Sequence, residues 1–187
     1  MLPEHYLFEA PNRAEKPKRP NSLLIGTRLI IDDQKAFNPH IRSSASLRKS
    51  AKRHFCDVSL AVAALGLNKD ALLNDLKYTG FLFESLVTHD LKVYAQANDA
   101  EVFHYRDSSG LEVDAIVQQY GGDWTAFEIK LGVGMIEEAA QNLRKFANNL
   151  DTTKTRRPAS LNIITGTGMS FTRADGINVI SLSSLGK

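Results

Sequence analysis

Cysteine is nearly absent from this chain of 187 residues, which contains only Cys56. A single cysteine excludes an internal disulfide and is typical of a reducing compartment, so we expect a cytoplasmic protein. Cys56 follows an aromatic residue and precedes an apolar run, and this setting favours a buried, inert thiol over a nucleophile.

Long hydrophobic runs are also missing. No apolar stretch approaches the roughly 20 residues that a membrane-spanning helix needs, and the N-terminus lacks the apolar region of a signal peptide. These absences predict a soluble protein without a membrane partner.

A large excess of charge is absent too, because the net charge is only +2. Contact with nucleic acid would therefore depend on local basic patches rather than on the field of the whole molecule. A phosphate-binding loop with the pattern Gly-x-x-x-x-Gly-Lys-Ser/Thr does not occur, and Gly166-Thr167-Gly168 lacks the lysine. We expect this turn to be structural and the chain by itself not to be an ATPase.

The chain is 43% hydrophobic and 24% charged, which is enough for one compact α/β domain with a core. Four of the six prolines lie in residues 1–22. We expect residues 1–40 to form an extended arm with a short strand or hairpin that ends at Asp32-Asp33, and residues 41–79 to form a basic linker with small helices. Residues 80–187 would be the main domain.

Helical patterns fill the middle of the chain. Asp57 or Ser59 starts a short helix closed by Gly66, and Asn68 starts a second helix over residues 69–78. A long helix is predicted after Gly80, over residues 81–95. The inward apolar positions of the last two helices are Leu72, Leu73, Leu76, Phe83, Leu86, Val87, Leu91 and Tyr94.

The second half predicts a three-strand meander over residues 101–106, 112–117 and 127–131, then a helix over residues 135–150 and strands over residues 161–165 and 177–180. Strict alternation would put Glu112, Asp114 and Ile116 on one face of their strand, and Glu128 and Lys130 together on the next. A two-residue turn at Gly121-Gly122 would separate Asp114 from Glu128, whereas a three-residue loop over 120–122 or a bulge would pair them directly. We favour the latter.

Paired in this way, Asp114, Glu128 and Lys130 would meet on one small surface. Two carboxylates suit a hard cation such as Mg²⁺, with the lysine beside a metal-bound water or a phosphate. Glu84 near the start of the long helix would be a third carboxylate, or simply a favourable charge at a helix N-terminus. The alternative for all these side chains is a solvated hairpin face without chemistry.

A basic, serine-rich segment runs from residue 41 to residue 54. We expect its cations to track a DNA backbone together with Arg106, or else to be a solvated connector. The cations of this segment are Arg42, Arg48, Lys49, Lys52 and Arg53.

Several stretches in this order resemble the domain of unknown function 4143 found at the C-terminus of prokaryotic AAA-type ATPases. They are Asn38-Pro39-His40-Ile41-Arg42, Lys52-Arg53-His54-Phe55-Cys56-Asp57-Val58-Ser59-Leu60-Ala61, Gly80-Phe81-Leu82-Phe83-Glu84-Ser85-Leu86-Val87, His104-Tyr105-Arg106-Asp107, Gly110-Leu111-Glu112-Val113-Asp114 and Phe127-Glu128-Ile129-Lys130-Leu131-Gly132. Asp on one strand and Glu-x-Lys on the next also resembles the PD-(D/E)xK pattern, although Val113 stands where that pattern has proline.

The resemblance implies a restriction-endonuclease-like core, in the order helix, three-strand meander, helix and strand, with a small helical N-terminal extension. Asp114, Glu128 and Glu84 would be metal ligands, and these three residues with Lys130 would be the catalytic group of a Mg²⁺-dependent deoxyribonuclease. The alternative is a non-catalytic regulatory or protein-binding module of an ATPase, whose ATPase part this sequence lacks.

Overall fold

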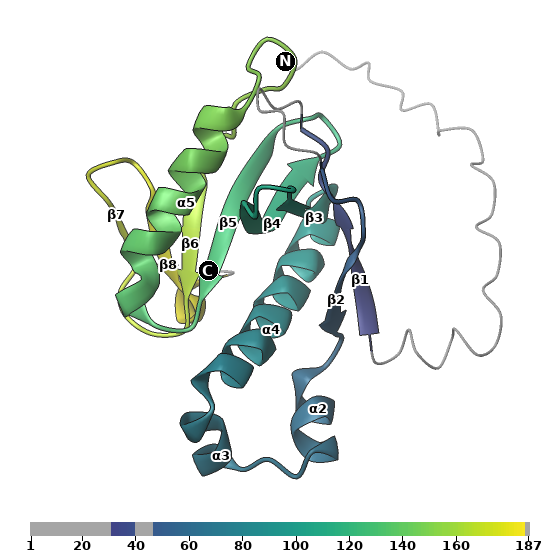
Figure 1. The fold of residues 1–187 in the computed structure, drawn as a ribbon, viewed down its shortest axis with the longest axis vertical. Coiled ribbons are helices and arrows are strands. Elements are labelled where there is room, and N and C mark those ends of the chain that lie inside the picture. The colour runs from purple at the N-terminus through teal and green to yellow at the C-terminus, as the bar shows by residue number, and fades with distance from the viewer. Residues whose placement is uncertain (1–30, 40–46, 186–187) are drawn as a thin grey trace, which may run out of the picture.

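The computed structural model describes residues 31–39 and 47–185. The expected extended arm over residues 1–22 lies outside these residues, as does all but the last residue of the strand or hairpin expected over residues 23–31. The described part is a mixed α/β fold in which four α-helices accompany an eight-stranded sheet of order β2-β1-β3-β4-β5-β6-β8-β7 (Figure 1). Among the described residues, no helix combines the length and the apolar character that crossing a membrane requires.

The first two strands form one end of the sheet. β1 (Ile31–Ala36) pairs antiparallel with β2 (Lys52–Phe55) and parallel with β3 (Ala100–Arg106). Two expectations were wrong here. Asp32 and Asp33 lie inside β1 instead of ending a strand, and Lys52 to Phe55 form a strand instead of continuing a loop. Pairing with partners far along the chain explains both, because local composition does not reveal it.

The next elements are α2 (Val58–Ala64), α3 (Lys69–Asn74) and α4 (Leu76–Ala97). Asp57 caps α2 by accepting from the Ser59 N–H, and Asn68 caps α3 by accepting from the Ala71 N–H, so the predicted starts of both helices are confirmed. The predicted end of the second helix is wrong. Asp75 caps α4, and α4 continues through Gly80, because the packing of a 22-residue helix on the sheet outweighs the cost of one glycine.

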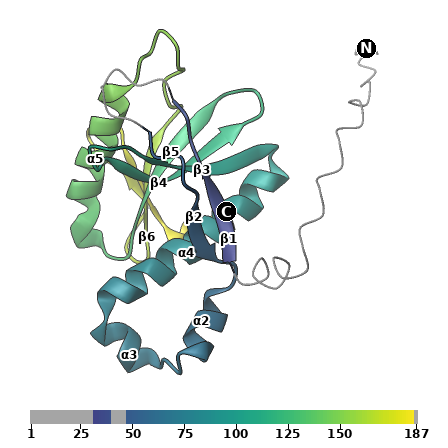
Figure 2. The same cartoon turned by 45° about the vertical axis from the view of Figure 1, so that its right-hand side comes forward.

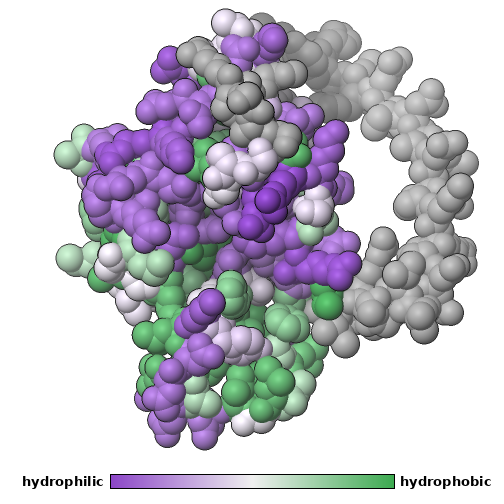
Figure 3. Space-filling view, viewed as in Figure 1, coloured by the Kyte–Doolittle hydropathy of each residue, from purple (hydrophilic) through white to green (hydrophobic). Residues whose placement is uncertain are grey.

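The helices α2 and α3 lie at one end of the molecule, beyond the start of α4 (Figure 2). Part of the predicted inward apolar stripe is wrong, because Leu73 and Leu76 are exposed at this end and Tyr94 is exposed further along α4. Figure 3 shows apolar residues gathered on the surface at this end. The exposed members of this helical end are Leu60, Leu65, Leu73, Leu76 and Phe81.

The meander β3, β4 (Glu112–Gln119) and β5 (Trp124–Lys130) is antiparallel, as expected. The short 3₁₀ turn η1 (Val133–Met135) leads into α5 (Ile136–Asn149), and β6 (Leu161–Thr165) returns parallel to β5. β8 (Asn178–Ser181) lies parallel to β6, the two-residue strand β7 (Phe171–Thr172) pairs antiparallel with β8, and a 3₁₀ turn η2 (Leu182–Ser184) follows.

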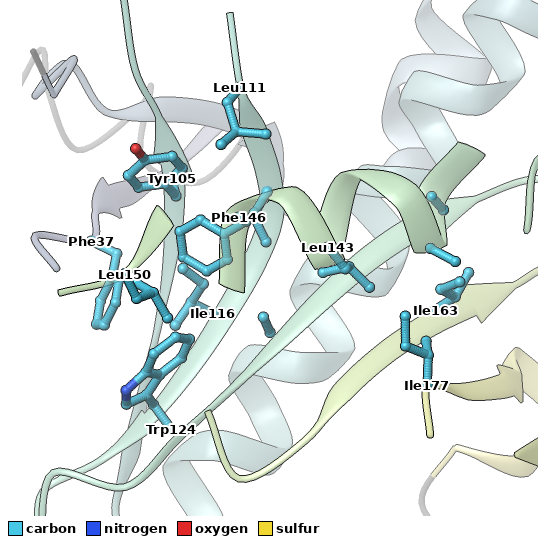
Figure 4. Packing of buried hydrophobic residues seen from close by; sticks show 14 residues of the cluster. Phe37, Tyr105, Leu111, Ile116, Trp124, Leu143, Phe146, Leu150, Ile163 and Ile177 are labelled. Carbon is cyan, nitrogen blue, oxygen red and sulfur yellow. The ribbon is translucent and has the colours of Figure 1, made fainter. Parts of the chain in front are cut away.

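The sheet is covered by α5 on one face and by α4 on the other. On the α5 face, Phe146 is fully buried between Tyr105 and Trp124, with ring centroids 4.7 Å and 6.0 Å away (Figure 4). On the α4 face, Val87 and Leu91 pack in the same cluster as Ala115 and Ile129. Both faces of the central strands are therefore buried, and polar side chains among them need partners inside the protein.

Candidate active site

The β4–β5 hairpin has the expected three-residue loop. The Gln119 N–H donates to the Asp123 carbonyl at 2.8 Å, so that residues 120–122 form the loop, and Gly122 takes a φ of +91°. A φ in this range favours glycine, which suits the last position of a three-residue hairpin loop. Ala115 pairs with Phe127, and the next step along this register places Asp114 opposite Glu128.

A β-bulge in β4 changes which side chains share a face. Phe103 pairs with Ile116 and Tyr105 with Val113, which leaves His104 opposite two residues, Asp114 and Ala115. The expected strict alternation is therefore wrong. Val113 and Ile116 both pack in the cluster under α5, whereas Ala115 packs in the cluster under α4. The extra residue in β4 reverses the alternation at this point, and it re-aims the side chain of Asp114.

The side chain of Gln34 holds this bulge from the neighbouring strand β1. Gln34 is fully buried, and its amide donates to the carbonyls of Phe103 at 2.9 Å and Asp114 at 3.0 Å. Its Oε1 atom accepts from His54 Nε2 at 2.9 Å, because an amide oxygen has no hydrogen to donate. His54 then has Nδ1 free to accept from the Ser85 hydroxyl of α4 at 3.4 Å.

The structure brings Asp114, Glu128 and Lys130 together. Lys130 Nζ lies 3.1 Å from Asp114 Oδ2 and 2.6 Å from Glu128 Oε2, and the Ile129 N–H donates to the same Asp114 oxygen at 2.9 Å. Glu128 is only 2% exposed. The Lys130 ammonium group thus bridges two buried carboxylates at the edge where β4 and β5 stop pairing.

Asn142 of α5 is a member of this group that sequence analysis missed. Its Nδ2 atom donates to Glu128 Oε1 at 2.6 Å and to the Glu112 carbonyl at 2.5 Å. Asn142 fixes the Glu128 carboxylate so that the other oxygen faces Lys130. The available signal was its place beside Ala139 and Leu143, the apolar stripe of α5, where an uncharged polar side chain borders a buried face.

Lys52 does not lie on an open phosphate-binding surface. Its Nζ atom is 2.6 Å from Glu84 Oε1, 3.1 Å from Glu112 Oε1 and 3.7 Å from Asp114 Oδ1. The strand β2 explains this, because alternation turns Lys52 to the same side as His54, towards α4. We therefore correct its assignment to the DNA-contacting group. Glu84, expected as a metal ligand, makes its close contact with this lysine.

Burial and mutual repulsion set the ionisation of these acids. Burial and the charge of Asp114 raise the pKa of Glu128 to about 8, and the same two causes raise the pKa of Glu84. Burial also opposes ionisation of Asp114, but the charges of Lys130 and Lys52 outweigh it and hold the Asp114 pKa below its ordinary range. Asp114 is therefore the firmly ionised acid of the group.

Burial alone would lower the pKa of both lysines. The carboxylates of Glu84 and Asp114 instead hold the pKa of Lys52 above its ordinary value, and those of Asp114 and Glu128 do the same for Lys130. Both ammonium groups consequently stay charged, and their positive charges are directed at acids.

The carboxylate oxygens of Asp114 and Glu128 are suitable ligands for a hard cation, but the Lys130 ammonium group already contacts both carboxylates. Within residues 31–39 and 47–185, no three His, Cys, Asp or Glu side chains are grouped closely enough to hold a metal as they stand. The pair Asp114 and Glu128 remains, and Mg²⁺ in proteins is commonly held by one or two carboxylates with water and phosphate oxygens completing its shell. The raised pKa of Glu128 marks a place where added positive charge would favour the ionised acid.

The remaining predicted DNA-contacting residues fall into three groups. Arg42 lies outside the described residues. Arg48 and Lys49 are exposed, and the Arg48 N–H donates to the Arg106 carbonyl at 2.9 Å, which attaches their segment to the end of β3 beside the site. Arg106 is 3.8 Å from Glu112, whereas exposed Arg53 is 3.8 Å from Asp33.

Two pockets adjoin the site. One of about 350 Å³ lies on the α5 side and is lined by Glu112, Glu128, Lys130 and Lys145 among others, and one of about 260 Å³ is bordered by Lys52 and Glu84. A larger pocket, about 650 Å³, lies between α4 and the sheet and is lined by none of the clustered acids and lysines. Each of the two smaller pockets therefore reaches part of the group, Glu128 and Lys130 in one and Lys52 and Glu84 in the other.

Comparison with known proteins gives one result. No curated protein and no solved structure matches this chain. One family does match, over residues 79–185, and this span begins inside α4 and includes Glu84, Asp114, Glu128, Lys130 and Asn142. The chain therefore belongs to the family described as a domain of unknown function (DUF4143).

Proposed function

We propose that this domain is a restriction-endonuclease-like nuclease that binds DNA and hydrolyses phosphodiester bonds with Mg²⁺. The observation that carries the proposal is the position of Asp114. Its carboxylate lies on a β-bulge, opposite Glu128 and 3.1 Å from Lys130 Nζ. Bulges recur beside active sites because they re-aim one side chain out of the regular strand pattern.

The order of elements supports the same proposal. The helix α4, the meander β3–β4–β5, the helix α5 and the parallel strand β6 follow one another as they do in the restriction-endonuclease-like core. Asp114 and the Glu128-x-Lys130 pair lie on the second and third strands of the meander, as in the PD-(D/E)xK pattern. The order of elements is weaker support for a nuclease than the geometry of the site, because proteins with one fold can have several functions.

Asp114 and Glu128 would hold the cation in this proposal. Mg²⁺ supplies a Lewis acid that polarises the phosphate and lowers the pKa of a bound water. Asp114 is ionised without the cation, whereas Glu128 is held partly protonated by burial and by the charge of Asp114. Binding of the cation would therefore release a proton from Glu128.

The surrounding side chains position and balance this pair. Lys130 would turn its ammonium to a water or to a phosphate oxygen, where it offsets developing negative charge. Asn142 keeps Glu128 oriented, and Gln34 keeps the bulge in place through the Asp114 carbonyl. Arg48, Lys49 and Arg106, at the same end of the sheet, would contact the DNA backbone.

The experiment that tests the proposal is cleavage of labelled single-stranded and duplex DNA in Mg²⁺, in Mn²⁺ and in chelator. The proposal expects cleavage that requires the metal. Absence of cleavage of both substrates in both metals would contradict it.

A second candidate function is favoured by the exposed apolar side chains of the helical end. Leu65 is 61% exposed and Leu76 is 59% exposed, which is unusual for leucines gathered at one end of a domain (Figure 3). This surface suits a non-catalytic protein-binding module, for instance one that docks on an ATPase. In that case the lysine-paired acids are a structural cluster, and Mg²⁺ should leave the unfolding temperature unchanged, whereas a metal-binding site should gain stability with metal concentration.

A further inference from the structure

Lys52 lies among three carboxylates at the outer side of the candidate site. Its ammonium group faces Glu84, Glu112 and Asp114 at 2.6, 3.1 and 3.7 Å. These three acids come from α4, from the start of β4 and from the bulge. The ammonium group donates a hydrogen bond to Glu112 and forms ion pairs with Glu84 and Asp114.

The two oxygens of Asp114 point to different cations. Oδ1 is the atom near Lys52, and Oδ2 is the atom near Lys130 and the Ile129 N–H. A carboxylate that serves two positive charges in this way is the arrangement that bridges the ions of two-metal sites, which lie about 3.5–4 Å apart. Here lysine side chains supply both charges, Lys52 at Oδ1 and Lys130 at Oδ2.

The position of Lys52 is fixed by its strand. The side chain is only 26% exposed, and two residues further along β2 the His54 ring is bonded to both Gln34 and Ser85. The antiparallel pairing of Gln34 with Lys52 ties the same point to β1. Strand pairing fixes the backbone of Lys52, and its ion pairs hold the ammonium group among the acids.

We propose that Lys52 is a built-in cation that keeps a second metal ion out, so that the domain takes one divalent ion, at Asp114 and Glu128. This inference rests on the proposed function. It assigns Glu84 to the lysine rather than to a metal, and it makes Lys52 a positioning residue for Asp114.

The test counts bound Mn²⁺ in the full chain, from the signal of free Mn²⁺ in an equilibrium titration. We expect one ion per chain in the wild type and two in Lys52→Met. The three carboxylates are too far apart to hold a metal as they stand, but without the ammonium group between them they can close on a second ion. Lys92→Met is the matched control, since Lys92 forms a 2.6 Å ion pair with Asp32 outside the cluster, and it should still bind one ion. An unchanged count in Lys52→Met would overturn the inference.

Glu84→Gln is a second test of the inference, and it can be used if Lys52→Met does not fold. Because Glu84 contacts the lysine, this variant should bind one Mn²⁺ with an affinity within about twofold of the wild type. A loss of affinity of tenfold or more would make Glu84 a metal ligand and overturn the inference while leaving the proposed function intact. Failure of the folded wild type and of every folded variant to bind Mn²⁺ would overturn both.

Discussion

The side-chain amide of Gln34 donates a hydrogen bond to the main-chain carbonyl of Asp114 over 3.0 Å, across 80 positions of the sequence. The same amide group serves the Phe103 carbonyl, and the Gln34 oxygen serves His54. The bulge that aims Asp114 therefore depends on a residue of another strand, and this dependence leads to the first prediction.

Gln34→Leu should destabilise the fold by about 1–3 kcal/mol, because it leaves buried carbonyls and a buried imidazole N–H without partners. Urea denaturation measures this change. Gln96→Leu, at an exposed position of α4, should cost far less. Equal losses in the two variants would mean that the Gln34 contacts do not hold the bulge.

The stability of the protein should fall on the acid side because of His54. Burial and the nearby charges of Lys52 and Lys92 lower the His54 pKa to about 4, below its ordinary 6.5. Between these two values the unfolded chain binds the proton and the folded chain does not, so the free energy of unfolding decreases as the pH falls from 6.5 to about 4. Below that range both states are protonated and the loss stops growing.

His54→Gln should remove the part of the acid-induced loss of stability that comes from His54, which amounts to about 1–3 kcal/mol in the wild type. The measurement is the difference in unfolding free energy between variant and wild type at several pH values. His89→Gln, at an exposed position, is the control. A difference that does not change with pH would show that His54 is not held neutral in the fold.

Asp114→Asn and Glu128→Gln should have opposite effects on the metal-free protein. The Asp114 pKa is held low by Lys130 and Lys52, so its charge stabilises the fold and the asparagine variant should lose about 1–3 kcal/mol. The Glu128 pKa is raised to about 8, so ionisation of Glu128 costs stability as the pH rises from 4.5 through 8.

Glu128→Gln should therefore gain stability relative to the wild type over that pH range, with no further gain above it. Urea denaturation between pH 6 and pH 9 in the presence of chelator gives both results. A loss of stability in Glu128→Gln that grows with pH would contradict the stated origin of the Glu128 shift.

The proposed DNA-contacting surface includes exposed Arg48 and Lys49 but not Lys52, which is paired with Glu84 and Glu112. Reversing Arg48 and Lys49 to glutamate should weaken DNA binding at every sequence, and it should reduce the slope of log affinity against log salt by about 0.9 for each lost duplex phosphate contact. Lys154 and Arg157, on the connection between α5 and β6, provide the matched charge reversal. If both double variants weaken binding equally, the effect belongs to net charge and not to this surface.

Parts of the site followed from local sequence pattern and parts did not. The glycine-containing loop and the alternation of β5 predicted that Glu128 and Lys130 share a face and that Asp114 lies opposite Glu128. The bulge escaped prediction because it arises from the pairing of β4 with β3, which local alternation does not encode.

Gln34 and Lys52 escaped for a related reason. Each reaches the site through β1 or β2, whose pairing with distant strands cannot be read from nearby residues. A cation in a basic, serine-rich segment favours a solvent-facing or DNA-facing role, yet Lys52 is turned inward by the strand that contains it. The helix boundary predicted at Gly80 was wrong for a similar reason, because the packing of α4 on the sheet outweighs the local preference of glycine for a helix end.

The most direct measurement is the single-turnover rate of labelled-DNA cleavage in Mg²⁺ for the wild type, Asp114→Asn and Lys130→Ala. Asp90→Asn, on α4 and outside the clustered acids and lysines, is the control. The account predicts metal-dependent cleavage by the wild type and the control, loss of at least a hundredfold in Asp114→Asn, and a slower rate with preserved Mn²⁺ binding in Lys130→Ala. A wild type that does not cleave DNA, or an Asp114→Asn variant that cleaves as fast as the wild type, would contradict a nuclease centre at Asp114, Glu128 and Lys130.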